Sequence, residues 1–289
     1  MPRAAWVVNL DAEDELARPS TATPPRALAL RVTAAMPALV PLLGPDALVL
    51  DPHALTPGEA VGCEGHAWCP TPRALAMLRR AGATVPEAPP LGVLQRVNHR
   101  RFAADLGQHL PGARWVDDGA TLEALRAAGA GPWLLKRPYG YNGRGRLRVR
   151  PGQLDDRERA WVAASFARGD GLQCEPEVPR VLDLAWHGLV GPDGGWQLGQ
   201  PTVQRCDAFG QWAGTELLSP DALSPEHRAR FRTTTERVAA ALADAGYFGP
   251  FGVDAFLYRD AAGAVALQPL SEVNARYSMG WVVGFGQPG

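Results

Sequence analysis

The segment DAFLYRDAAGAVALQPLSEVNAR, residues 254–276, decides the fold prediction for this chain of 289 residues. Two largely apolar runs flank the turn Asp260–Gly263, which predicts a β-hairpin. The turn places Asp254 on one strand nearly level with Glu272 on the other. Two buried carboxylates that face each other repel unless a cation lies between them, so the hairpin predicts a cation site.

Two more polar residues share the face of the hairpin that carries Glu272. Every second side chain of a strand lies on one face, so Asn274 and Arg276 line up beside Asp254. Two carboxylates and an amide oxygen suit magnesium, which typically takes a few protein oxygens together with substrate phosphates. Arg276 adds a fork that can hold a carboxylate or a developing oxyanion. The alternative is an ordinary sheet edge whose polar face is only solvated.

A glycine-rich turn earlier in the chain has the complementary chemistry. A buried strand is expected to end at Lys136, and a turn with glycines at 140, 143 and 145 leads into a second strand. Glycines let backbone amides approach phosphate oxygens, and Lys136 supplies a compact positive charge. The turn is neither a Walker A loop, since no G-K-[ST] follows, nor a dinucleotide fingerprint, since a strand comes next. A tight turn without a ligand is the alternative.

The order of these features resembles the ATP-grasp superfamily of carboxylate-amine and carboxylate-thiol ligases. Lys136 and the glycine-rich turn come first, and the stretch Glu175–Val178 and Asp183 follow. The acidic hairpin that ends in E-x-N-x-R closes the series and is the most specific part of the match. The resemblance spans about residues 93–280.

The resemblance implies an α+β protein with the ATP-grasp fold. Two α+β subdomains would sandwich ATP, preceded by a small α/β N-terminal lobe, and the expected boundaries are 1–92, 93–176 and 177–289. Within the first lobe, Thr71 as N-cap and Gly82 as C-terminal glycine predict a helix between them. At the start of the second unit, Asn98 is expected to cap a helix that runs to about His109.

The resemblance also assigns the phosphate and metal contacts. Lys136 would contact the ATP phosphates, and the turn would fold over them as a lid. The lid residues are Tyr141, Asn142, Gly143, Arg144 and Gly145. Asp254, Glu272 and Asn274 would bind Mg2+ that bridges the phosphates.

The nucleoside contacts follow in the same way. Glu175, with the backbone of Glu177 and Val178, would form the hinge that reads adenine, and Asp183 would hold the ribose hydroxyls. The cofactors implied are therefore ATP and Mg2+.

The reaction implied by the resemblance is ligation. A carboxylate attacks the γ-phosphate to give an acyl phosphate, and an amine or similar nucleophile then displaces phosphate. Arg276 would orient the acceptor carboxylate, so Arg276 and Lys136 are the predicted catalytic residues. Substrate contacts are also expected from Arg205 and Asp207, in a loop rich in reactive side chains, because loops on a rigid sheet often bind ligands.

The chain departs from the superfamily pattern at two places. Many members carry a second lysine before the central subdomain, and here either His99 or Arg100 takes that place. Some ligases have an arginine two positions before the first metal aspartate, where this chain has Gly252. With Gly252 at that position, Arg276 is expected to supply more of the positive charge, and Arg205 is a second candidate for this role.

Two rival functions use the same residues. A phosphotransferase would phosphorylate its acceptor and stop, and product analysis separates it from a ligase. A non-catalytic nucleotide-binding scaffold would be expected to lose a metal ligand or the phosphate lysine, and this chain keeps both. Small-molecule or peptide carboxylate and amine substrates fit the ligase prediction equally well.

Composition excludes several other classes. The formal net charge of −1 argues against a broad nucleic-acid surface. We expect no membrane span, since prolines interrupt the apolar stretch 36–49, and no signal peptide, since the first residues turn acidic early. A cytoplasmic protein is therefore expected, and the sequence leaves a homodimer open.

The cysteines offer one further alternative. Cys63, His66 and Cys69 could in principle bind zinc, although they lack the paired short spacings of a structural site. Free thiols in a loop are the other interpretation.

Overall fold

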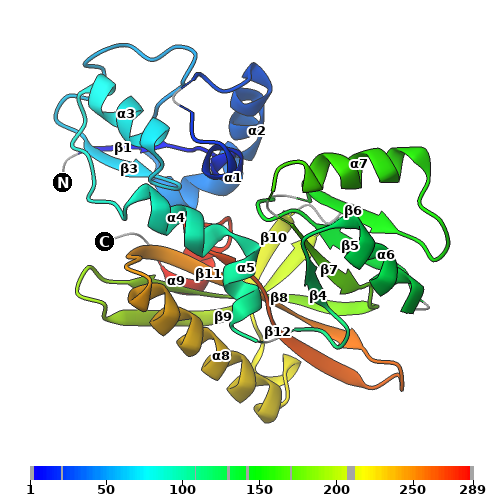
Figure 1. Cartoon of the computed structure of the whole chain (residues 1–289). Coiled ribbons are helices and arrows are strands. Elements are labelled where there is room, and N and C mark those ends of the chain that lie inside the picture. The colour runs from blue at the N-terminus through cyan, green and yellow to red at the C-terminus, as the bar shows by residue number, and fades with distance from the viewer. Residues whose placement is uncertain are drawn as a thin grey trace.

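The computed structural model shows three units, each made of a sheet and helices, that lie side by side (Figure 1). It describes residues 3–20, 22–107, 109–128, 131–140, 143–169, 171–206 and 212–286. Each unit has its own β-sheet, and the three sheets follow one another along the chain.

The first unit is a small parallel sheet with helices on its faces. Its strands are β1 (Ala4–Val7), β2 (Leu48–Val49) and β3 (Glu64–Ala67), in the order β2-β1-β3. Its helices are α1 (Ala12–Ala17), α2 (Arg26–Leu43) and α3 (Pro72–Ala81). Helix α3 begins and ends as predicted, because the Thr71 side chain accepts a hydrogen bond from Ala74 N–H and Gly82 adopts a φ of 81°.

Helix α2 bears on the expectation that the chain has no membrane span, which stays a prediction of the sequence. By length and composition alone, it is long and apolar enough to cross a membrane, although the sequence predicted no such segment. The prediction missed it because it required an uninterrupted apolar run, and this helix includes Arg31, Pro37 and Pro41. Leu39, one of its buried residues, packs into the main core.

The second unit is an antiparallel sheet that carries the glycine-rich turn. Its strands are β4 (Arg114–Val116), β5 (Trp133–Lys136), β6 (Arg146–Val149) and β7 (Leu172–Pro176), in the order β4-β7-β5-β6. Helices α6 (Gly119–Ala128) and α7 (Asp156–Phe166) belong to the same unit. Strands β5 and β6 form the predicted hairpin, in which Lys136 is the register partner of Arg146.

The third unit is a five-stranded antiparallel sheet that carries the acidic hairpin. Its strands are β8 (Arg180–Val190), β9 (Trp196–Cys206), β10 (Trp212–Leu217), β11 (Gly249–Arg259) and β12 (Val265–Asn274), in the order β10-β9-β8-β11-β12. The short helix η1 (Pro220–Ala222), helix α8 (Pro225–Asp244) and helix α9 (Trp281–Phe285) complete it. Helix α8 lies along one side of this sheet (Figure 1).

The first and third units share one hydrophobic core. Trp6 and Leu39 from the first unit belong to the same buried cluster as Phe231 and Phe251 from the third. The second unit has a separate core that includes Leu135 and Leu172. The first lobe is therefore packed firmly against the sheet that carries the acidic hairpin.

Asn98 joins two distant segments and does not cap a helix as predicted. Helix α4 (Leu91–Asn98) ends at this residue, and His99 caps the next helix, α5 (Arg100–Asp105). The buried Asn98 side chain accepts a hydrogen bond from Ala275 N–H at 2.9 Å and donates one to the Leu94 carbonyl at 3.0 Å. The cap prediction was wrong because a helix-capping residue is judged from local sequence, and Ala275 is 177 residues away.

We predict that Asn98→Ala destabilises the protein. The variant leaves the fully buried Ala275 N–H without its acceptor, which costs about 1–3 kcal/mol of unfolding free energy. Urea denaturation measures this loss, with Arg96→Ala on the exposed side of α4 as the control, expected within about 0.5 kcal/mol of wild type. Equal stability of the two variants would contradict a stabilising role for the hydrogen bond between Asn98 and Ala275.

Candidate active site

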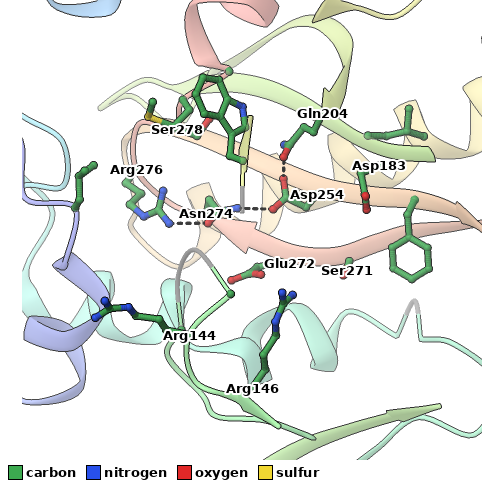
Figure 2. Close-up of a pocket in the computed structure, with 18 of the residues that line it drawn as sticks. Arg144, Arg146, Asp183, Gln204, Asp254, Ser271, Glu272, Asn274, Arg276 and Ser278 are labelled. Atoms are coloured by element: carbon green, nitrogen blue, oxygen red, sulfur yellow. Dashed lines mark hydrogen bonds between the residues drawn. The ribbon is translucent and has the colours of Figure 1, made fainter. Parts of the chain in front are cut away.

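A cavity of about 920 Å³ lies where the three units meet. The second unit contributes Lys136 and the turn to β6, and the third contributes the polar face of β8, β11 and β12. Figure 2 shows part of this lining, with Asp254, Glu272 and Asn274 on the sheet of the third unit and Arg146 opposite them. Predicted site residues that line it are Lys136, Gly143, Arg144, Asp183, Asp254, Glu272, Asn274 and Arg276.

The two carboxylates of the acidic hairpin are direct register partners, as predicted. Asp254 on β11 pairs with Glu272 on β12. Both Asp254 oxygens accept hydrogen bonds, from Gln204 Nε2 and Asn274 Nδ2, each at 3.0 Å. Burial, reinforced by the Glu272 charge, nevertheless raises the pKa of Asp254 to about 7. The pair therefore carries an electrostatic cost that a bound cation would relieve.

Arg100 forms an ion pair with Glu272. Its Nη1 lies 2.8 Å from Glu272 Oε2. Its Nε donates to the Arg137 carbonyl at 3.1 Å, at the base of the glycine-rich turn. Of the two candidates for the missing second lysine, Arg100 lines the cavity, whereas His99 caps α5.

Arg276 is held by the first lobe. Its Nε donates to Glu13 Oε1 at 2.6 Å, its Nη2 donates to Asn274 Oδ1 at 2.9 Å, and its Nη1 donates to the Tyr277 carbonyl at 2.9 Å. Glu13 lies on α1 and is only 5% exposed. The sequence predicted that the Arg276 guanidinium binds a substrate carboxylate. In the structure this group contacts Glu13, a buried carboxylate of the protein itself.

Lys136 is buried and paired. Its Nζ lies 2.6 Å from Glu175 Oε2, and Gln173 Nε2 donates to Glu175 Oε1 at 2.9 Å. Burial lowers the pKa of Lys136, and the Glu175 carboxylate partly opposes this effect. The ammonium group therefore reaches the cavity already oriented by its neighbour.

The glycine-rich turn needs its glycines for close packing. A Cβ on Gly140 would lie 2.6 Å from the Arg144 carbonyl oxygen, and Gly143 and Gly145 adopt φ values of 76° and 71°. Arg144 and Arg146 both line the cavity, where Arg146 extends toward Glu272 and Arg144 points away from the acidic residues (Figure 2). The predicted lid residues Tyr141 and Asn142 lie outside the described residues.

The predicted adenine hinge lies beside the cavity and does not line it. Glu175 is engaged by Lys136, Glu177 N–H donates to the Pro132 carbonyl at 2.9 Å, and Val178 packs against a small cluster with Phe256. Asp183 does line the cavity, where it accepts a hydrogen bond from Arg180 at 2.8 Å.

Of the two predicted substrate residues, Arg205 is described and does not lie at the cavity, although its neighbour Gln204 does. Arg205 pairs with Glu216 at 2.9 Å, and both side chains are exposed. It is absent from the residues that line the cavity. Asp207 lies outside the described residues.

The cysteine motif forms no metal centre. Within the described ranges, no group of three or more His, Cys, Asp or Glu side chains could hold a metal ion. Cys63 and Cys69 are buried free thiols, and burial raises the pKa of Cys69. His66 stacks on Trp6 with 4.8 Å between the ring centroids.

Several cavity residues were missed by sequence reasoning. Arg31 on α2, Arg146, Arg180 and Gln204 all line the cavity. Arg31 and Arg180 belong to no recognisable motif, and Gln204 was passed over for the more reactive side chains that follow it. Arg146 faces Lys136 in register and could have been found by placing the two strands side by side.

The acidic hairpin fits magnesium by its chemistry. Asp254, Glu272 and Asn274 supply only oxygen donors, which a hard divalent cation prefers. Two carboxylates are fewer than a protein-only cage requires, but they suffice when substrate phosphates supply further ligands. Burial, and secondly the Glu272 charge, raise the pKa of Asp254, so a cation bound beside Asp254 would favour its ionised form.

No protein-family model and no curated protein sequence matches the chain, but solved structures do. N5-carboxyaminoimidazole synthetase from Staphylococcus aureus, complexed with ADP, has a TM-score of 0.53 at 10% identity, covering 96% of this chain and 71% of its own. D-alanyl-alanine synthetase A from Vibrio cholerae has a TM-score of 0.56 at 13% identity, and the match covers 99% of this chain and 92% of that one.

A third match is the biotin carboxylase domain of Hydrogenobacter thermophilus 2-oxoglutarate carboxylase, in complex with MgADP, ADP and bicarbonate. Its TM-score is 0.54 at 14% identity, and the match covers 96% of this chain and 65% of that one. All three are ATP-grasp enzymes, so the chain has the α+β ATP-grasp fold that the sequence predicted.

We predict that Asp254→Asn changes how stability depends on pH. The pKa of Asp254 in the folded protein lies above its ordinary value, so the unfolded chain releases this proton first and wild-type stability falls as the pH rises from about 4 through 7. Between pH 5 and pH 8 the loss is roughly 2 kcal/mol. Asp254→Asn should lack this loss, as measured by denaturation without metal.

The exposed Asp244→Asn on α8 is the matched control and should follow the wild-type pH profile. A parallel profile for Asp254→Asn would show that the hairpin does not store this electrostatic cost.

Proposed function

We propose that this ATP-grasp chain is an ATP-dependent, ADP-forming ligase that activates a carboxylate as an acyl phosphate and couples it to an amine or similar nucleophile. One observation carries the proposal. The cavity brings Lys136 and the glycine-rich turn from one sheet together with Asp254, Glu272 and Arg276 from another. The solved structures that share the fold are synthetases and a carboxylase, two of them with ADP bound.

The described residues divide the binding task. Lys136, Gly143 and Arg144 line the cavity, and they are proposed to contact the phosphates. Asp254, Glu272 and Asn274 would hold Mg2+, which when bound offsets the negative charge of the phosphates during transfer. The Asp254–Glu272 register pair favours this use, because two neighbouring carboxylates repel and a bound cation lowers that repulsion.

The remaining assignments extend this proposal to the nucleoside. Asp183 on the cavity wall is proposed to bind the ribose hydroxyls. The end of β7 and the connection from it to the third sheet are proposed to contact adenine through Glu175, Glu177 and Val178. Four further expectations stay predictions of the sequence. They are a cytoplasmic location, no nucleic-acid partner, no membrane partner, and a homodimer.

The proposed reaction has two steps, transfer of the γ-phosphoryl group to the carboxylate and displacement of phosphate by the amine. An oxygen of the substrate carboxylate forms a bond to the γ-phosphorus while the bond from that phosphorus to the ADP oxygen breaks. The amine then adds to the acyl carbon, loses a proton, and expels inorganic phosphate. Arg276 lies beside Asn274 at the cavity wall, where its positive charge favours the oxyanion that forms in the second step.

We predict magnesium-dependent ATP binding that requires Glu272. Isothermal titration calorimetry should give a micromolar Kd for wild type with Mg2+ and much weaker binding without it. Glu272→Ala should weaken binding in Mg2+ by about tenfold or more, since it removes a metal ligand and leaves Arg100 unpaired.

Glu226→Ala, an exposed glutamate at the start of α8, is the control and should bind like wild type. If folded wild-type protein binds no ATP, the ligase proposal is wrong. If it binds ATP equally well with and without Mg2+, the assignment of the acidic hairpin is wrong.

A further inference from the structure

Ser278 and His187 form a hydrogen-bonded pair at the cavity wall. Ser278 follows β12, two residues after Arg276, and lines the cavity (Figure 2). Its Oγ lies 2.9 Å from Nε2 of His187 on β8. His187 is only 1% exposed, so Ser278 is the member of the pair that a ligand can touch.

Three glycines leave the space that the His187 ring fills. A Cβ on Gly252 would lie 3.1 Å from the ring, one on Gly280 would lie 3.2 Å away, and one on Gly284 would lie 2.6 Å from Nδ1. Any side chain at Gly284 would therefore displace the ring. The imidazole is thus fixed behind Ser278 by close backbone packing.

The surroundings of the ring determine where its proton lies. Burial lowers the pKa of His187 to about 4, so the ring is neutral near pH 7 and carries one N–H. In the part of the chain that the structure describes, Nδ1 has no hydrogen-bond partner. A buried N–H without an acceptor is rarer and costlier than an unpaired lone pair. The proton therefore belongs on Nε2, which donates to Ser278 Oγ.

This tautomer sets the role of the serine hydroxyl. Because Ser278 Oγ accepts from His187, its own hydrogen is free to donate to another group. The cavity is the open side of Ser278. The pair thus presents an oriented hydrogen-bond donor to a ligand oxygen.

Arg276 by itself has too few unpaired N–H groups to bind a substrate carboxylate through two hydrogen bonds. A guanidinium has five N–H groups, and contacts with Glu13, Asn274 and the Tyr277 carbonyl occupy four of them. One Nη1 hydrogen is left without a partner among the described residues, which is too few for a bidentate grip on a carboxylate. A second donor close in sequence would complete the site.

The wall formed by α2 and its neighbours is largely apolar. Ala34, Ala35 and Ala38 of α2 line the cavity, as do Trp68 and Met279, and Arg31 is the one charged residue that α2 adds. The Arg276 guanidinium lies 6.0 Å from the Trp68 ring centroid, which places this wall beside Arg276 and Ser278. A substrate held at Ser278 would therefore lay its body against small apolar side chains.

We propose that Ser278, oriented by His187, is the hydrogen-bond donor that positions the acceptor carboxylate, and that the acceptor is a carboxylic acid with an apolar body. The inference rests on the proposed ligase function and names the substrate class of the same site. Ser278 holds one carboxylate oxygen, the remaining Arg276 N–H holds the charge, and the alanine face of α2 accepts the body. His187 acts through Ser278 as a positioning residue.

The first test uses hydroxylamine as the nucleophile, which converts an acyl phosphate into a hydroxamate and releases phosphate. The probes are phenylacetate and hexanoate, with apolar bodies, and succinate and L-aspartate, with a second charge. We expect hydroxamate from an apolar acid and not from the two diacids. In Ser278→Ala the KM for that acid should rise by about tenfold or more, while the KM for ATP stays unchanged.

Variants of the histidine separate positioning from simple structural support. His187→Gln keeps an N–H donor and should remain close to wild type, whereas His187→Leu should resemble Ser278→Ala. The exposed Ser219→Ala is the control for serine replacement. An unchanged acid KM in Ser278→Ala overturns the proposal, and so does Mg-ATP binding without hydroxamate from either apolar acid. Failure of Mg-ATP binding would instead overturn the proposed function.

A second test needs no substrate. Nitrogen-15 NMR of the histidine side chains, with the His187 signals assigned by their loss in His187→Gln, should show the Nε2–H tautomer at pH 7. Ser278→Ala should shift the Nε2 signal. A proton on Nδ1, or a charged ring at pH 7, would overturn the proposed orientation of Ser278.

Discussion

The repulsion between Asp254 and Glu272 is the constraint around which the cavity is organised. Antiparallel pairing of β11 and β12 places the two carboxylates side by side, where burial makes their charges costly. Gln204 and Asn274 donate to Asp254, and Arg100 pairs with Glu272. These partners lie on β9, β12 and α5. Contacts with the two carboxylates therefore connect three separate regions of the chain at the cavity wall.

The first lobe takes part in the site. Glu13 on α1 orients Arg276, and Tyr277 N–H donates to the Trp68 carbonyl at 3.1 Å. Asn98 binds the backbone of Ala275 between them. The three residues after β12 are therefore held from outside their own sheet, at the boundary where the first and third units share a continuous core.

The second unit stands apart from this arrangement. Its core, around Leu135 and Leu172, is separate from the core shared by the other two units. It meets the acidic hairpin through polar contacts, such as Arg100 with the Arg137 carbonyl and with Glu272. Polar contacts across a cavity can be exchanged for contacts with a ligand more readily than a packed core can be opened.

The sequence by itself determined the local features. Period-two patterning and turn residues are short-range signals, and they were enough to place Asp254 opposite Glu272 and Lys136 at the end of a strand. The order of these motifs was enough to predict the ATP-grasp fold. Tertiary structure alone decided that Glu13 pairs with Arg276 and that His187 lies behind Ser278. Such contacts join segments far apart in the chain, and packing sets them without leaving a local pattern.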